Sequence, residues 1–342
     1  MEFQITWFVL WGVLWAVYFM LDGFVLGGGI LHRVLAKTDA ERRVVINAFG
    51  PVWDGNEVWL LTAGGATFAA FPTAYAQMFS YLYTALFLLL ASLIVRGVSF
   101  EFRSKEEGAA WRGTWDTVIV VTSFLPALLF GVAFGNIFEG LPMDAQGYHG
   151  GLLSLLNPYG LVTGVLFVLL FLVHGALYLS LKTVGSLSKK AEDLAKALWL
   201  PLTVVAVGFL VFTAFATKLY NNYLAHPVLL IAPVVAVVAL LSVRALLAKA
   251  APGKAFAASC LTVLGVVATG VIGLFPNLIP STLDPNYSLT IFNSSSSLYT
   301  LKIMTAVALI FVPIVILYKI WAYRVFRERL TTEAVLADHE AY

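Results

Sequence analysis

The feature that most constrains this chain is a series of nine long apolar stretches separated by short polar gaps. Each has roughly 17–27 residues, and about 20 residues of α-helix cross the roughly 30 Å hydrocarbon core of a bilayer. The 342 residues are 60% hydrophobic and 12% charged, so the fold class is an all-α polytopic membrane protein. The predicted helices are 5–31, 44–67, 73–95, 114–137, 155–181, 197–217, 227–243, 255–275 and 298–318.

Lys and Arg alternate strictly between these gaps. Nineteen of the 21 basic residues lie in the gaps 32–43, 96–113, 182–196 and 244–254 or after residue 318. By the positive-inside rule these segments are cytoplasmic, so we expect the N-terminus outside and the C-terminus in the cytoplasm. Because 32–43 and 96–113 are then both inside, the stretch 44–67 must cross, and nine transmembrane helices result. We expect residues 1–342 to form a single integral-membrane domain.

Several classes of function are excluded by composition. The net charge of +2 gives no case for nucleic-acid binding, and a single cysteine, Cys260, excludes an internal disulfide or a cysteine-rich metal site. Helical proteins that hold haem usually use axial His or Met side chains. His174 is the only histidine inside a predicted helix; the others are His32, His149, His226 and His339. We therefore expect no haem and no metal site in this chain.

Three carboxylates lie where the chain is otherwise built for lipid. Asp54 and Glu57 occur in WDGNEVWL, and Asp22 occurs in DGFVLGGG. An ionisable group at membrane depth costs at least a few kcal/mol, so it calls for an explanation. Asp54 and Glu57, three residues apart, share a helix face and lie within about 3 Å of the helix centre; Asp22 lies about 6 Å toward the cytoplasmic side.

These acids are candidates for a proton path, and the alternative is a hydrogen-bonded network that locks the first two predicted helices together. No basic residue is predicted near the membrane centre. We therefore expect some of the acids to be neutral, or to face water or a partner subunit.

Glycines and tryptophans surround the acids. Gly23 and Gly27 have the small-xxx-small spacing that lets transmembrane helices approach closely, which favours a packing role. Gly28, Gly29, Gly64 and Gly65 extend this pattern. Trp53 and Trp59 flank the acid pair, and core packing is the favoured role for Trp59.

Specific segments resemble subunit II of the cytochrome bd quinol oxidases over essentially the whole chain. They are ERRVVINAFGPVWDGNEVWLLTAGGATFAAFP, LDGFVLGGGI, RGVSFEFRSK, WRGTWD, GVAFGN and LLNPYGLVTG. The resemblance implies two four-helix bundles plus one peripheral helix. It also implies a complex with a subunit I that carries two b-type haems, one d-type haem and the quinol site. Such a complex lies in the bacterial cytoplasmic membrane, reduces oxygen to water with quinol electrons and takes protons from the cytoplasm.

The resemblance assigns roles to individual residues. Asp54 matches an acidic position at the subunit boundary where a proton route begins, and Trp59 matches a tryptophan associated with lipid-side oxygen entry. Trp53, Gly55 and Asn56 match the same motif, and family members can have Gln at the position of Glu57. The resemblance further implies a very small single-helix subunit, and it leaves open whether a structural quinone binds here.

We therefore expect an oxidase subunit that supports the haem-bearing partner, contributes to proton delivery and is not catalytic alone. One alternative is a purely structural scaffold. The other is a secondary transporter, which would also need acids at mid-membrane; against it, the chain has an odd number of predicted helices and no paired broken helices in two halves.

Overall fold

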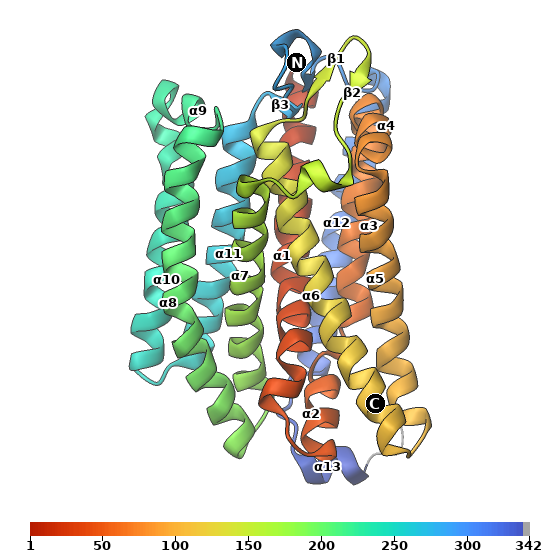
Figure 1. Cartoon of the computed structure of the whole chain (residues 1–342), viewed down its shortest axis with the longest axis vertical. Coiled ribbons are helices and arrows are strands. Elements are labelled where there is room, and N and C mark those ends of the chain that lie inside the picture. Colours follow the sequence, from red (N-terminus) through yellow and green to blue (C-terminus); the bar gives the residue numbers. More distant parts are fainter. Residues whose placement is uncertain (338–342) are drawn as a thin grey trace.

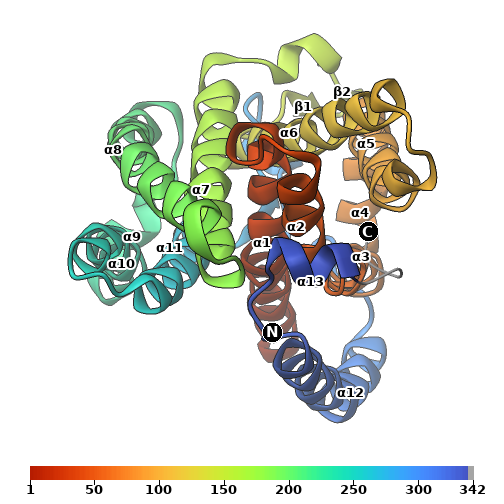
Figure 2. The ribbon, with the colours of Figure 1, turned by 90° about the horizontal axis from the view of Figure 1, so that it is seen from below.

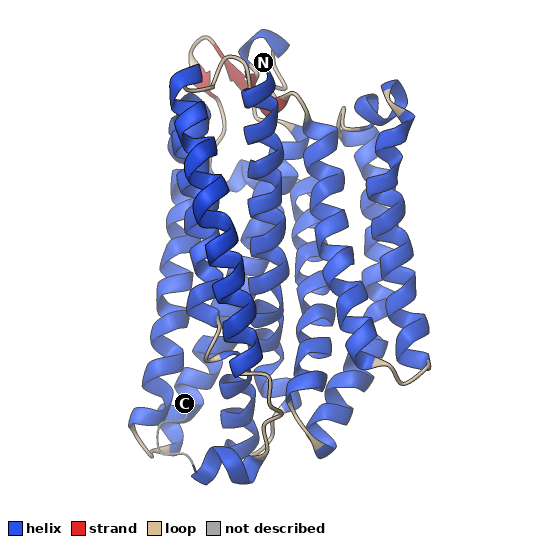
Figure 3. Ribbon diagram, turned by 180° about the vertical axis from the view of Figure 1, so that it is seen from behind, coloured by secondary structure: helices blue, strands red, loops and turns tan. Residues whose placement is uncertain are grey.

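The computed structural model describes residues 1–337, and most of them are helical (Figures 1 and 3). The α-helices are α1 (Glu2–Leu35), α2 (Asp39–Phe49), α3 (Trp53–Ala70), α4 (Pro72–Tyr81), α5 (Tyr83–Phe102), α6 (Ala109–Glu139), α7 (Pro158–Lys182), α8 (Gly185–Ala216), α9 (Tyr220–Ala225), α10 (Ile231–Ala248), α11 (Pro252–Leu274), α12 (Leu298–Val325) and α13 (Thr332–Ala337). Short 3₁₀ turns are η1 (Arg103–Lys105), η2 (Leu152–Leu155), η3 (Pro227–Leu230) and η4 (Pro285–Tyr287).

Eight helices among the described residues are long and apolar enough to cross a membrane. They are α1, α5 with η1, α6, α7, α8, η3 with α10, α11 and α12. The helix α3 is not among the eight, because Asp54, Asn56 and Glu57 reduce the hydropathy of its first turns. A ninth crossing by α3 therefore stays a prediction.

The second predicted helix, 44–67, is wrong as one continuous helix. The structure divides it into α2 and α3, with a turn at residues 50–52. Pro51 has no backbone N–H to donate to the preceding turn, so α2 ends there. The third predicted helix, 73–95, is likewise divided at Leu82 into α4 and α5.

Two predicted cytoplasmic gaps are partly helical. The helix α5 continues through Arg96 to Phe102, and α8 begins at Gly185, so the expected gap 182–196 is mostly the first turns of α8. Charge marks where a segment leaves lipid, whereas a helix continues as long as its backbone hydrogen bonds do.

The helix α1 is the centre of the molecule, in contact with α3, α6, α7 and α11 (Figure 1). The helices α7, α8, α10 and α11 pack on one side of it, and α3, α5 and α6 on the other. The helix α12 stands at the periphery beside α1 and α3 (Figure 2).

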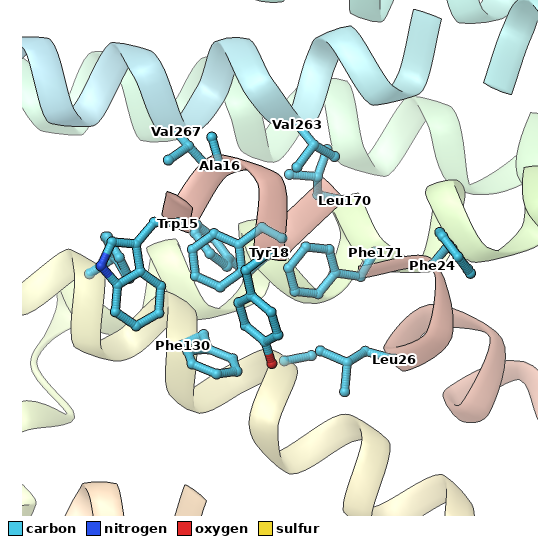
Figure 4. Packing of buried hydrophobic residues seen from close by; sticks show 14 of the residues in the cluster. Trp15, Ala16, Tyr18, Phe24, Leu26, Phe130, Leu170, Phe171, Val263 and Val267 are labelled. Atoms are coloured by element: carbon cyan, nitrogen blue, oxygen red, sulfur yellow. The ribbon is translucent and has the colours of Figure 1, made fainter. Parts of the chain in front are cut away.

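Two features of α1 fix this arrangement. Its buried aromatic rings pack against α6 and α7: the Tyr18 and Phe130 ring centroids are 5.3 Å apart (Figure 4). A side chain at Gly27 would overlap the backbone carbonyl of Phe171, and one at Gly175 would lie 2.4 Å from the backbone nitrogen of Gly28. The backbones of α1 and α7 are therefore in direct contact, which only glycine permits here.

Both strand pairs lie at the end that carries the N-terminus (Figure 3). Strands β1 (Met143–Asp144) and β2 (Gly147–Tyr148) are antiparallel, with Met143 opposite Tyr148. Strands β3 (Asn277–Ile279) and β4 (Leu289–Thr290) form the second antiparallel pair. The opposite end carries α2 and α13 (Figure 1).

Candidate functional site

The site is a buried charge cluster in which three helices each contribute one side chain. The Arg96 Nη2 atom of α5 donates to Asp22 Oδ2 of α1 at 2.9 Å and to Glu57 Oε1 of α3 at 2.5 Å. Arg96 and Asp22 have no exposed side-chain surface, whereas Glu57 is 23% exposed. The Tyr18 hydroxyl donates to the same Asp22 oxygen at 3.3 Å.

Arg96 overturns one expectation about these acids. The sequence places it in the predicted cytoplasmic gap 96–113 and predicts no cation near the carboxylates. A visible signal was the apolar sequence on both sides of it, in LIVRGVSF. The guanidinium instead supplies a buried countercharge, which is how most ionisable groups are tolerated at membrane depth.

The cluster has unused hydrogen-bonding capacity. Asp22 Oδ1 and the Nε and Nη1 atoms of Arg96 are buried and have no hydrogen-bond partner among the described residues. Buried polar atoms of this kind usually bind ordered water. Two carboxylates around one guanidinium also leave one negative charge, which a single proton can neutralise.

Asp54 lies apart from this cluster. Its side chain is exposed, and Oδ1 accepts a hydrogen bond from the Gly55 backbone N–H at 2.5 Å. Its charge interacts with Glu57 and with Lys319 of α12. Of the three candidate acids, the structure brings Asp22 and Glu57 together and places Asp54 on the outward side of α3.

Asn56 joins three helices. Its Nδ2 atom donates to the Leu21 carbonyl oxygen at 2.8 Å, and its Oδ1 atom accepts from the Tyr323 hydroxyl at 2.9 Å and from Lys319 Nζ at 3.3 Å. A side chain at Gly55 would collide with the Lys319 ammonium group. Lys319, predicted to lie in the tail, therefore belongs to this site.

The remaining candidates have simple surroundings. The Trp53 and Phe100 ring centroids are 5.5 Å apart, and a side chain at Gly97 would touch the Trp53 ring. Trp59 is buried, and its Nε1 has no partner among the described residues. Gly23 faces the Phe171 ring, whereas no described atom lies within 4 Å of a side chain built at Gly64 or Gly65.

The structure contains a second charged cluster that the sequence did not predict, centred on Asp116 and Asp39. The sequence predicts His32 in a gap, but it is a fully buried residue of α1, and its Nε2 atom donates to Asp116 Oδ1 at 2.6 Å. Asp116 also accepts from Arg42 at 2.8 Å and from Arg103 Nε at 2.6 Å. Arg103 and Arg112 both donate to Asp39, at 2.8 and 2.9 Å.

The two buried histidines of the described chain, His32 and His174, are each hydrogen-bonded to another residue. His174 Nε2 donates to the Met20 carbonyl oxygen at 2.9 Å, and Nδ1 accepts from Ser259 Oγ at 2.7 Å, so both ring nitrogens are occupied. His32 is held by Asp116, and His339 lies outside the described residues. Within residues 1–337, no group of three or more His, Cys, Asp or Glu could hold a metal ion.

Fold and site together define a polytopic α-helical membrane protein with a buried charge cluster. The model for cytochrome bd terminal oxidase subunit II matches residues 3–326, and the chain belongs to that family. The resemblance carried by WDGNEVWL and the other segments is thereby confirmed.

Named relatives match along nearly their whole length. Cytochrome bd-I ubiquinol oxidase subunit 2 of Escherichia coli (strain K12) is 39% identical over 371 residues, covering 98% of this chain and 97% of that protein. Cytochrome bd ubiquinol oxidase subunit 2 of Bacillus subtilis (strain 168) is 36% identical over 326 residues, covering 95% and 96%.

The fold is also that of a solved structure. A chain of the bd oxidase from Geobacillus thermodenitrificans superposes with a TM-score of 0.79 over 95% of this chain and 99% of that one. Its sequence identity is 17%, so this likeness concerns the fold alone.

Proposed function

We propose that the chain is the second subunit of a quinol:oxygen oxidoreductase in the bacterial cytoplasmic membrane. Its named relatives are subunits of cytochrome bd ubiquinol oxidases, which supports a partner subunit I. The haems and the quinol site belong to that partner, and this chain alone is not catalytic. Its role is to support subunit I and to deliver protons from the cytoplasm toward it.

The observation that carries this proposal is the exposure of Asp54 on an apolar helix face. Exposed side chains along α3 include Val58 (50%), Leu61 (71%) and Phe68 (61%). A carboxylate facing lipid is costly, so a protein partner is the better neighbour for this face. The open glycines Gly64 and Gly65 would let a partner helix approach closely.

A route for protons can be followed inward from that face. Glu57 is partly exposed and touches Arg96, which touches Asp22 and, through it, the Tyr18 hydroxyl. The atoms of Asp22 and Arg96 without partners offer places for water. A relay needs groups that gain and lose a proton, and the carboxylates of this series can do so.

The scaffold alternative rests on the same geometry. Asp22 and Arg96 are fully buried and paired, as a structural ion pair would be. In that case α1, α3 and α5 are held together, and no proton moves. The family membership lends no support to a secondary transporter.

The proposal includes the finer architecture. With nine crossings, α3 is the ninth membrane span, the N-terminus is outside, and α12 is the helix peripheral to two four-helix bundles within one membrane domain. The oxygen-access role of Trp59, the small third subunit and a structural quinone remain expectations of the family resemblance.

The test compares Asp54→Asn with Asp54→Leu in the purified complex, by turnover per d-type haem. Asp54→Asn keeps size and much hydrogen bonding but cannot exchange a proton, so turnover is expected to fall at least about tenfold with haem content unchanged. Asp193→Asn, on the exposed first turns of α8, is the matched control. Full turnover in Asp54→Asn, together with poor assembly of Asp54→Leu, would refute the relay in favour of the scaffold.

A further inference from the structure

A cavity of about 520 Å³ lies at the end of the molecule that carries the N-terminus. It forms where three spanning helices end together: α6 at Glu139, α8 at Ala216 and α11 at Leu274. Because helix ends reach the headgroup region of a bilayer, the cavity lies at that depth.

The walls of this cavity are held by hydrogen bonds within the chain. The Asn222 side-chain amide donates to the carbonyl oxygens of Ile272 and Gly273, both at 3.0 Å. The Leu141 backbone N–H donates to the Pro280 carbonyl oxygen at 2.9 Å. Ligand sites are usually preformed in this way and have volumes of a few hundred Å³.

Two opposite charges line the cavity from different elements. Glu139 is the last residue of α6 and is half-buried, and Lys218 follows the end of α8 and is exposed. Among the described residues neither has an oppositely charged partner, and Glu139 interacts with the side-chain amide of Asn157. The site therefore offers one carboxylate for a cation and one ammonium group for an anion.

An apolar track leads away from the cavity along α8. Val204, Val207, Val211 and Phe215 recur at helical spacing and are 62%, 55%, 56% and 83% exposed. Phe215 lines the cavity itself, so the track ends there. A molecule with a charged head and a long apolar tail fits both parts.

We propose that this cavity binds the headgroup of a zwitterionic phospholipid, with one acyl chain along α8. Lys218 contacts the phosphate, as lysine does in many phosphate sites, and Glu139 accepts hydrogen bonds from the ammonium group. Phosphatidylglycerol would present the same phosphate to Lys218, but its uncharged glycerol would leave the Glu139 carboxylate without a cation. This lipid-site proposal does not depend on the proposed role of the chain in proton delivery.

The experiment reconstitutes the purified complex in nanodiscs that contain equal amounts of phosphatidylethanolamine and phosphatidylglycerol. Retained lipid is counted by native mass spectrometry. Because each variant removes one partly exposed ion pair, Glu139→Gln and Lys218→Gln should each lower retained phosphatidylethanolamine about threefold. Lys302→Gln, an exposed lysine of α12 outside the cavity, should leave it unchanged.

Two further arms keep the outcome decisive. The double reversal Glu139→Lys with Lys218→Glu keeps both charges and should bind more phosphatidylethanolamine than either single variant. Free phosphoethanolamine should not displace the bound lipid. If it displaced the lipid, the cavity would bind a soluble headgroup compound without the acyl chain, and the proposal would be overturned. Equal retention of phosphatidylglycerol by the wild-type complex, or unchanged retention in both single variants, would also overturn it.

Discussion

The guanidinium of Arg96 lies 2.9 Å from the carboxylate of Asp22, and neither side chain has any exposed surface. These residues are 74 positions apart in the chain, and they join α5 to α1. Glu57 adds α3 to the same contact. One arginine thus pairs with two acids and joins three helices at one point.

The first prediction concerns this arginine. Arg96→Gln leaves two carboxylates without a buried cation, and removal of one partner of a buried pair typically costs about 3–5 kcal/mol. We expect the yield of assembled, haem-containing complex to fall severalfold. Adding Asp22→Asn should recover part of the yield, because a neutral pair needs no countercharge. Normal assembly of Arg96→Gln alone would contradict the structural importance of the cluster.

The second prediction concerns the contact of α1 with α7. Gly27→Ala places a methyl group onto the Phe171 carbonyl oxygen, a backbone atom that no rotamer change can move. Overpacking of a tight contact typically costs about 1–3 kcal/mol. The temperature at which half of the complex loses its d-type haem absorbance should therefore fall by several degrees. Gly208→Ala, on an exposed face of α8 with no atom within 4 Å, is the control and should leave it unchanged.

The apolar stretches predicted where most helices lie, but the charge cluster could not be derived from them. A buried arginine such as Arg96 and a cytoplasmic one look alike when only neighbours in the chain are considered. Its partners Asp22 and Glu57 become visible as partners only once α1, α3 and α5 are packed. The contact of His32 with Asp116 could not be predicted for the same reason, because the two residues are 84 positions apart in the chain.

The break between α2 and α3 has a different cause. Charge alternation bears on which side of the membrane a segment lies, not on whether its helix is continuous. Pro51 was visible in the sequence, yet proline is tolerated in membrane helices where other groups satisfy the freed carbonyl. The acids Asp54 and Glu57 were identified from the sequence, but the outward direction of Asp54 depends on the actual start of α3 at Trp53.

The third prediction concerns the attachment of α12. Asn56 binds both Lys319 and Tyr323 of α12, a helix in which Leu301 is the only buried residue. Asn56→Leu removes both bonds, so trypsin should cleave after Arg324 and Arg327 faster than in the wild-type complex. Tyr323→Phe removes one bond and should have a smaller effect. Equal cleavage rates in all three proteins would show that α12 is held elsewhere, for example by Lys182, which binds the Glu328 carbonyl oxygen.

The last prediction decides whether α3 is a ninth crossing. At about 1.5 Å per residue its 18 residues span about 27 Å, close to the thickness of the hydrocarbon core. If α3 crosses, its junction with α4 lies outside, on the same side as the β1–β2 turn. In a Cys260→Ala background, Thr73→Cys and Ala145→Cys should react with a membrane-impermeant maleimide in intact cells, and Glu107→Cys should react only after permeabilisation. Each of these positions is exposed. Protection of Thr73→Cys together with reaction of Ala145→Cys would show that α3 does not cross.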